Sequence, residues 1–582
     1  MVGALVTPSV IASLSAVSAH HLPGWLYPES DGAGGEILSV QYALLTLGLS
    51  LVAAGIALSL YRWSLARRLI HLFLFSILLE LFYRFAYGGA VSAGVLVSVP
   101  ETSRRETREL LAGHEMLTVS LSLVALMAIY ALLVSWRADI RFSFKGCAEV
   151  AGVATAMILA SFALGGYELG ATKPLESLLL DEAHVTFPFD VATALGAVAI
   201  DMGESRRLAS ARARFKFPNP RMVQAPSRRD AQEIYVVVIG ETSRRISWSL
   251  FGYSRPTTPR LDAIKSDLIL FDRVSSNATN TILSMPLALT RASPATREVS
   301  LSEKSIITLL RQSGFDTYWI SNQDRSEALF NPISRIALEA DHVSFPEGIQ
   351  GDGRGDAFDS NLLTRLNDAL TGLSPGAKAV FFLHMEGSHF GYKERYPATF
   401  ALFSGGQGAP RSLPAHELQL IDEYDNSIYF TDHNLRGIID RLSGCDCKAG
   451  LIFFSDHGER LFDSGLADSE FGHGFPTVSR QEIDVPFFVW LSSAYRKDNQ
   501  SLVETLESNA PATAELHNVF ETITDLAGVD YDGREASLSL FSAKFRPPLE
   551  LQVLNTNEAT VSLQPLAPLP PGAPAGDDPT VK

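Results

Sequence analysis

Acidic and histidine side chains of the kind that bind divalent metals come just after several short apolar stretches of this sequence. They comprise two carboxylates and three imidazoles: Glu241, His389, Asp456, His457 and His473. Zinc accepts such a mixture of oxygen and nitrogen ligands, and a catalytic zinc keeps one coordination position open. A lone acid at the end of a strand is more often a helix cap, but the whole group together predicts a metal site.

A hydroxyl-rich segment, Ser276–Pro286 with the sequence SNATNTILSMP, is a candidate source of a nucleophile for this site. An alcohol is a poor nucleophile at neutral pH, but coordination to zinc would activate it, since a metal lowers the pKa of the oxygen that it binds. On residue type alone, Thr279, Thr281 and Ser284 are equal candidates. The alternative interpretation is that these residues cap a helix.

The apolar stretches around these residues are predicted strands of an α/β domain. They are Ile234–Ile239, Leu268–Val274, Thr317–Ile320, Ala379–His384, Leu451–Ser455 and Val485–Leu491. Unbroken apolar runs are typical of strands buried on both faces, as in a mostly parallel sheet covered by helices. The apolar spacing over Ala415–Leu442, just after Pro414, predicts one of those helices. Such sheets bind ligands beyond the carboxyl ends of their strands, which is where the metal-type residues lie.

Composition separates an apolar N-terminal part from a more polar remainder. Charged residues make up only 19% of the 582 residues, and the net charge is −16. An acidic chain argues against a general nucleic-acid binder, which needs a basic face. Three cysteines are too few for a disulfide scaffold or a four-thiolate zinc site.

Residues 1–170 are predicted to form a transmembrane domain of about five helices. The apolar segments are Val2–Ala19, Ile37–Tyr61, Leu69–Pro100, Met116–Trp136 and Val150–Tyr167. Ile37–Tyr61 carries no charge and is long enough to cross a bilayer, whereas Val2–Ala19 is marginal and also resembles a signal peptide that lacks its basic start. Basic residues after the second and fourth segments predict cytoplasmic loops there, which places the chain after Tyr167 outside.

The rest of the chain divides into three predicted parts. Residues 171–230 are expected to form an interfacial helix and linker, whose basic run Arg206–Lys216 would lie on anionic lipid. Residues 231–562 form the α/β domain. The Pro- and Ala-rich residues 563–582 are expected to be disordered.

The motifs together resemble the bacterial inner-membrane phosphoethanolamine transferases of the alkaline phosphatase/sulfatase superfamily. The matching stretches are VVVIGETSRRISWSLFGYSRPTTPRLD, NATNTILSMP, HMEGSHFGYKERYP, EYDNSIYFTD, FFSDHGE and FGHG. This resemblance implies a multi-pass helical membrane bundle in the inner membrane, followed by a periplasmic sulfatase-like domain. It also implies transfer of phosphoethanolamine from phosphatidylethanolamine, through a threonine intermediate, to lipid A, core oligosaccharide or another envelope glycan. We expect a monomer with no nucleic-acid partner.

The resemblance also implies roles for individual residues. It selects Thr281, five residues before Pro286, as the nucleophile. The first zinc would be held by Glu241, Thr281, Asp456 and His457. His389 and His473 would bind the phosphate group or a second zinc, so that one or two ions are expected.

A stretch in the predicted membrane domain, VSVPETSRRETREL, resembles the lipid-headgroup loop of the same family. Glu101, Thr102 and Glu106 match the family pattern, while Ser98 stands where the family has asparagine. Helical spacing would place Ser98, Thr102 and Glu106 on one face, able to meet an ethanolamine ammonium. The plainer interpretation is an exposed charged linker.

Three other functions fit the sequence less well. A phosphoglycerol transferase, or another lipid-dependent enzyme of the superfamily, would share the metal and the threonine, but the headgroup loop argues against it. A sulfatase would need a Cys or Ser in a C/S-x-P-x-R motif, and no cysteine lies near position 281. A metal-free membrane scaffold would not need the full ligand set.

Many family members carry several disulfides in the periplasmic domain, whereas only Cys445 and Cys447 lie there in this sequence. The interval from Asp456 to His473 also looks longer than in lipid A-modifying members, which favours a different acceptor.

Overall fold

The computed structural model describes residues 155–156, 208, 210–223, 232–323, 332–346, 358–409, 413–463, 471–475, 477–556 and 558–565. Apart from residues 155–156, these all lie in Gly203–Lys582, the second of the two compact units into which the chain divides. Within the described ranges, no helix combines the length and the apolar character that a membrane crossing requires. The stretches predicted as membrane helices lie almost entirely outside these ranges, as do Ser98, Thr102 and Glu106.

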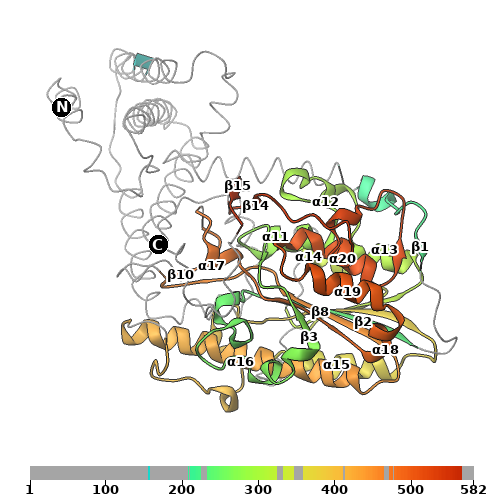
Figure 1. Ribbon diagram of the computed structural model, residues 1–582. Helices are drawn as coiled ribbons and strands as arrows, with labels where there is room; N and C mark the ends of the chain where they lie inside the picture. The colour runs from blue at the N-terminus through green and yellow to red at the C-terminus, as the bar shows by residue number, and fades with distance from the viewer. Residues whose placement is uncertain are drawn as a thin grey trace, which may run out of the picture. The chain divides into compact units, whose positions relative to one another are not determined.

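A seven-stranded sheet forms the centre of the described unit (Figure 1). Its strands, in spatial order, are β3 (Leu268–Leu270), β11 (Phe487–Leu491), β8 (Lys448–Ser455), β2 (Glu233–Gly240), β7 (Lys378–His384), β5 (Asp316–Ser321) and β6 (His342–Ser344). The five strands from β8 to β6 run parallel, whereas β11 runs antiparallel to both of its neighbours. The predicted α/β class is confirmed, and the sheet is mixed because of β11.

Five of the six predicted strands lie in this sheet over nearly the predicted residues. The exception is Leu268–Val274, which splits into β3 and a separate strand β4 (Val274–Ser275). The polar pair Asp272 and Arg273 interrupts the apolar run, and β4 pairs instead with β12 (Ala514–Glu515). The hydroxyl-rich segment therefore follows β4, outside the seven-stranded sheet.

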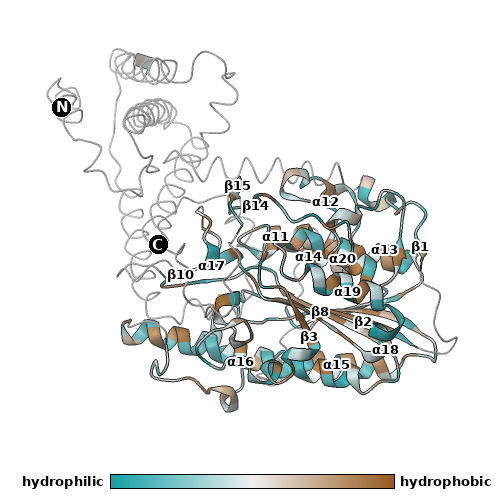
Figure 2. Ribbon diagram, in the orientation of Figure 1, coloured by the Kyte–Doolittle hydropathy of each residue, from teal (hydrophilic) through white to brown (hydrophobic). Residues whose placement is uncertain are grey.

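Strand β2 shows how the sheet is buried on both faces. Tyr235, Val237 and Ile239 belong to one apolar core, which includes residues of α11 (Thr281–Leu289), α13 (Ile306–Gln312) and α20 (Val519–Leu526). The alternate residues Ile234, Val236 and Val238 belong to a second core with α15 (Ser360–Thr371) and α16 (Ala415–Ser443). Figure 2 shows the central strands as hydrophobic between helices of mixed character. Because side chains alternate along a strand, an unbroken apolar run fills both cores.

Helix α16 confirms the predicted helix and precedes strand β8 along the chain. It begins after Pro414 and ends at Ser443, one residue beyond the predicted end. A disulfide between Cys445 and Cys447 then precedes β8. A loop this short restricts the unfolded chain little, so the two apolar cores are the main source of stability.

Part of the predicted linker packs on the α/β domain. Phe217 is buried in the first core beside Tyr531, and β1 (Arg221–Met222) pairs with β13 (Val529–Asp530). Arg212, which was expected to lie on lipid with the rest of the basic run, forms an ion pair with Glu339 instead. This charge-assisted contact with a buried carboxylate holds Arg212 against the α/β domain.

Candidate metal centre and nucleophile

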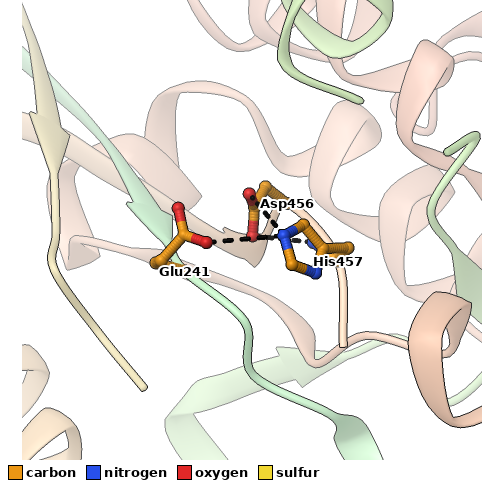
Figure 3. A group of neighbouring side chains, drawn as sticks. All are labelled: Glu241, Asp456 and His457. Carbon is orange, nitrogen blue, oxygen red and sulfur yellow. Dashed lines mark hydrogen bonds and ion pairs between the residues drawn. The ribbon is translucent and has the colours of Figure 1, made fainter. Parts of the chain in front are cut away.

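Three buried side chains meet where the two central parallel strands end (Figure 3). Strands β2 and β8 pair in register up to Gly240 and Ser455, so the residues that follow lie side by side. Glu241, Asp456 and His457 each offer a ligand atom, and these atoms lie within 4.8 Å of one another. The Nε2 atom of His457 is 3.4 Å from Glu241 Oε1 and 3.4 Å from Asp456 Oδ2. The strand register therefore creates a compact, water-excluded ligand cluster.

The predicted nucleophile reaches this cluster from a different part of the fold. Thr281 is the first residue of α11, and the side chain of Asn280 caps that helix. Thr281 Oγ1 lies 3.1 Å from Glu241 Oε1 and 3.1 Å from His457 Nε2. Ser284, an alternative on residue type, instead donates its hydroxyl to the carbonyl of Asp456. Among the three candidate hydroxyls, Thr281 is the one hydrogen-bonded to the ligand side chains.

The electrostatics of the cluster favour a positive charge beside the two carboxylates. Burial, followed by repulsion from the neighbouring Glu241, raises the pKa of Asp456 to about 7. Burial would raise the pKa of Glu241 as well, but the hydrogen bond and charge of His457 hold it well below its usual value. For His457, the two carboxylates outweigh the effect of burial and raise its pKa to about 10. Two adjacent buried carboxylates stay ionised only beside positive charge, which the protonated His457 supplies here and which a divalent ion would supply in its place.

The chemistry of the donor atoms fits zinc. His457 Nδ1 lies 2.8 Å from the carbonyl oxygen of Gly458, which can only accept, so Nδ1 carries a proton. If a metal ion displaces the proton on Nε2, the lone pair of Nε2 then faces the position between the carboxylates, as a metal ligand requires. Two carboxylates, one imidazole and one hydroxyl then surround one position. Such a mixed oxygen and nitrogen set suits zinc.

Several residues that sequence reasoning missed hold the ligands in place. Gln323 Nε2 donates to Glu241 Oε2 at 2.9 Å and to the carbonyl of Met385 at 2.9 Å. Thr242 donates its hydroxyl to Glu241 Oε1 and its amide to Asp456 Oδ1, with a φ of 55° that is unusual for threonine. Gln323 lies just past β5, so following every strand to its carboxyl end would have identified it.

A glycine lets the next loop approach Glu241 closely. A Cβ at Gly387 would lie 2.7 Å from the carbonyl oxygen of Glu241, and the φ of Gly387 is +55°. Asp359 fixes this loop by accepting the amides of Glu386 and Gly387. Any other residue at 387 would push the loop off the site.

The two other predicted histidines flank the cluster. The ring of His473 is centred 4.3 Å from that of His457 and 6.1 Å from that of His389. Glu459, which is buried, lies 3.3 Å from His473 Nδ1 through both carboxylate oxygens. The structure thus brings together all six residues predicted for the α/β domain, and their catalytic and metal-binding roles stay predictions.

The chain resembles known proteins across this unit. Residues 233–529 match the family model described as Sulfatase. Phosphoethanolamine transferase EptC of Escherichia coli O18:K1:H7 is 30% identical over 315 residues, which cover 53% of each chain. Kdo(2)-lipid A phosphoethanolamine 7''-transferase of Escherichia coli K12 is 32% identical over 304 residues, covering 50% of this chain and 49% of the relative. The chain thus spans about half the length of the curated relatives it matches.

Solved structures extend the resemblance. The crystal structure of the C-terminal periplasmic domain of EptC from Escherichia coli, in complex with Zn, has a TM-score of 0.53 and 26% identity, and the match covers 60% of this chain and 96% of that domain. The integral membrane protein lipooligosaccharide phosphoethanolamine transferase A from Neisseria meningitidis has a TM-score of 0.69 and 19% identity, with 93% of this chain and 99% of that chain covered. At that identity the second likeness concerns the fold alone.

Proposed function

Because this chain belongs to the sulfatase family, we propose that it is a phosphoethanolamine transferase that uses phosphatidylethanolamine as its donor. The proposal depends on one observation, that Thr281 Oγ1 lies 3.1 Å from both Glu241 Oε1 and His457 Nε2. An alcohol in contact with a buried metal-type ligand set is what transfer through a covalent intermediate requires. The names of two relatives describe transfer of phosphoethanolamine.

Zinc is the metal that we propose for this centre. Glu241, Thr281, Asp456 and His457 would hold it, and when bound it would lower the pKa of the threonine hydroxyl and offset negative charge on the phosphoryl oxygens. The EptC domain with Zn supports this choice. His389 and His473 would contact the phosphate or contribute to a second ion, and metal analysis of the purified protein would give the number.

The reaction has two displacement steps. Thr281 Oγ1 forms a bond to phosphorus while the bond between phosphorus and the diacylglycerol oxygen breaks. Diacylglycerol leaves with a proton, and phosphoethanolamine stays as an ester of Thr281. An acceptor hydroxyl or phosphate then attacks the same phosphorus, the bond between phosphorus and Thr281 Oγ1 breaks, and Thr281 takes up a proton to become the free alcohol again.

The residues of the chain prepare the site for this charge transfer. Glu241, Asp456 and His457 are almost fully buried, so water is excluded and each electrostatic contact is strengthened. His389 and His473, whose rings lie beside that of His457 and beside each other, would contact the equatorial phosphoryl oxygens of a bound donor. Glu459 orients the His473 ring through its contact with Nδ1.

A lipid donor requires the site to face a bilayer. We propose that residues 1–170 form the membrane domain, that residues 171–230 connect it to the catalytic domain over 231–562, and that most of 563–582 forms a tail, although Leu563 itself ends β15. The catalytic domain would lie on the periplasmic side of the inner membrane, as the EptC domain is described. Ser98, Thr102 and Glu106 would contact the ethanolamine headgroup. The fold likeness to an integral membrane protein over 93% of the chain supports this arrangement.

The acceptor is an envelope glycolipid or glycan: a lipid A phosphate, a core sugar or another periplasmic glycan. One relative acts, by its name, on Kdo(2)-lipid A. Incubating the protein and labelled phosphatidylethanolamine with separated envelope fractions would identify the acceptor as the fraction that takes up label.

The function is tested on the full chain purified in detergent and incubated with labelled phosphatidylethanolamine. Mass spectrometry should find phosphoethanolamine on the peptide that contains Thr281, and Thr281→Ala should carry none. Thr371→Ala, which removes an exposed hydroxyl on α15, is the matched control and should label like the wild type. A phosphoethanolamine adduct that persists in Thr281→Ala would refute the assignment.

A further inference from the structure

The loop that leads to Thr281 is tied to the last two strands of the domain. Strands β14 (Leu551–Leu554) and β15 (Thr560–Leu563) form an antiparallel hairpin near α11 (Figure 1). The amide of Leu554 donates to the carbonyl of Asn277 at 2.8 Å, and the amide of Thr279 donates to the carbonyl of Leu554 at 3.2 Å. The hairpin thus adds a short parallel bridge along the loop just ahead of the nucleophile.

The side chain of Asn277 joins three segments that are distant in sequence. Asn277 is fully buried, and its Nδ2 donates to Glu515 Oε1 at 3.0 Å and to the carbonyl of Gln552 at 3.0 Å. Its Oδ1 accepts the amide of His517 at 2.8 Å. Glu515 Oε1 also accepts the amide of Gln552 at 2.9 Å. The asparagine amide therefore uses both donors and one acceptor to hold the loop, β12 and β14 together.

The other side of the loop is hydrogen-bonded to Asp456, one of the candidate metal ligands. Ser276 Oγ and Ser284 Oγ each lie 2.6 Å from the carbonyl oxygen of Asp456. Apolar contacts reinforce the first side, where Leu554 packs with Ala278. Thr281 follows directly after a loop that contacts the hairpin and β12 on one side and the backbone of Asp456 on the other.

We propose that the C-terminal hairpin, Glu515 and Asn277 form a clamp that positions Thr281 against the metal centre. We call this set the nucleophile clamp, and Asn277 is its positioning residue, because its contacts lie with the hairpin and β12. Losing the clamp would let Thr281 drift, and a displacement of about 1 Å at a reacting atom can cost roughly 10²-fold in rate. As far as rate is concerned, the inference rests on the proposed function.

Paired variants of the full chain test the clamp. Asn277→Ala and Glu515→Ala should each lower kcat for adduct formation by roughly 10²-fold, with KM for phosphatidylethanolamine changed much less. Glu515→Gln keeps an acceptor oxygen for both amides and should stay near the wild-type rate. Asn509→Ala is the matched control, because Asn509 also donates twice to carbonyl groups, those of Leu540 and Ser542, away from this loop.

Hydrogen–deuterium exchange of the same proteins gives a readout that needs no activity. Amides in residues 276–284 should exchange faster in Asn277→Ala and Glu515→Ala, but not in Glu515→Gln or Asn509→Ala. If the wild type forms no adduct while exchange behaves as expected, the proposed function fails and the clamp stands. If the wild type is active and the Asn277 and Glu515 variants keep their kcat or their slow exchange, the clamp is refuted. Should Asn277→Ala fail to fold, the Glu515 pair alone decides.

Discussion

The candidate metal ligands and the candidate nucleophile are held in the same site by different means. Glu241 and Asp456 follow two adjacent strands whose register ends in the same place, at Gly240 and Ser455. Thr281 instead begins a helix after a buried loop, which is held by contacts with Asp456, Glu515 and Leu554. The ligands gain their geometry from the sheet, whereas the nucleophile depends on a network of single hydrogen bonds. We therefore expect substitutions of the ligands to remove the metal, and substitutions around the loop to misplace a threonine beside an intact metal site.

The largest effect should come from the ligand side. Asp456→Asn removes one of two carboxylate charges from a buried site and should lower both zinc affinity and adduct formation by about 10³-fold or more, since second-sphere changes alone cost up to about 10²-fold. Competition with a chromophoric chelator measures the affinity. Asp440→Asn, at an exposed position of α16, should change neither quantity. Wild-type zinc affinity in Asp456→Asn would remove Asp456 from the ligand set.

A smaller loss should follow from the support of a ligand. Gln323→Ala removes the donor to Glu241 Oε2, so Glu241 should be less well oriented. Outer contacts of this kind typically contribute about 10- to 100-fold to metal affinity or activity. Zinc affinity and adduct formation should fall together, whereas Asn277→Ala should leave zinc affinity nearly unchanged. If Gln323→Ala lowered the rate at saturating zinc but left the affinity intact, Gln323 would act on the substrate instead.

The same contrast explains what could be predicted from the sequence. The resemblance to the phosphoethanolamine transferases and the α/β class are confirmed, and Glu241, Asp456 and His457 were predictable neighbours because parallel strands share a carboxyl edge. The contacts of Asn277 were not predictable, since its partners lie more than 200 residues away and no periodic pattern marks a hydrogen bond to Glu515 or Gln552. The split of Leu268–Val274 was missed because an apolar run does not show where a strand changes partner.

The clamp should also make stability depend on pH. Burial raises the pKa of Glu515 to about 7, above its ordinary value of 4.5, so the folded state favours the protonated acid. Its stabilising contribution is therefore complete below the unfolded pKa and is lost as pH rises through the folded one. Between pH 5 and 7.5, the free energy of unfolding of the wild type should fall by about 2 kcal/mol more than that of Glu515→Gln. Thermal unfolding of both proteins across this range measures the difference, and equal slopes would show that Glu515 does not titrate in the clamp.

The smallest effect should come from a side chain of the hairpin itself. The Gln552 side chain donates to Ser562 Oγ in an exposed position, whereas its backbone amide and carbonyl make the contacts with Glu515 and Asn277. Gln552→Ala should therefore cost no more than about 0.5 kcal/mol of unfolding free energy and leave kcat for adduct formation unchanged. A loss in Gln552→Ala as large as that in Asn277→Ala would mean that side chains of the hairpin, rather than its backbone, hold the loop. Unchanged kcat would show that β14 holds the loop before Thr281 through its main-chain groups and its buried apolar side chains alone. The residues on the exposed face of β14 would then be free to vary.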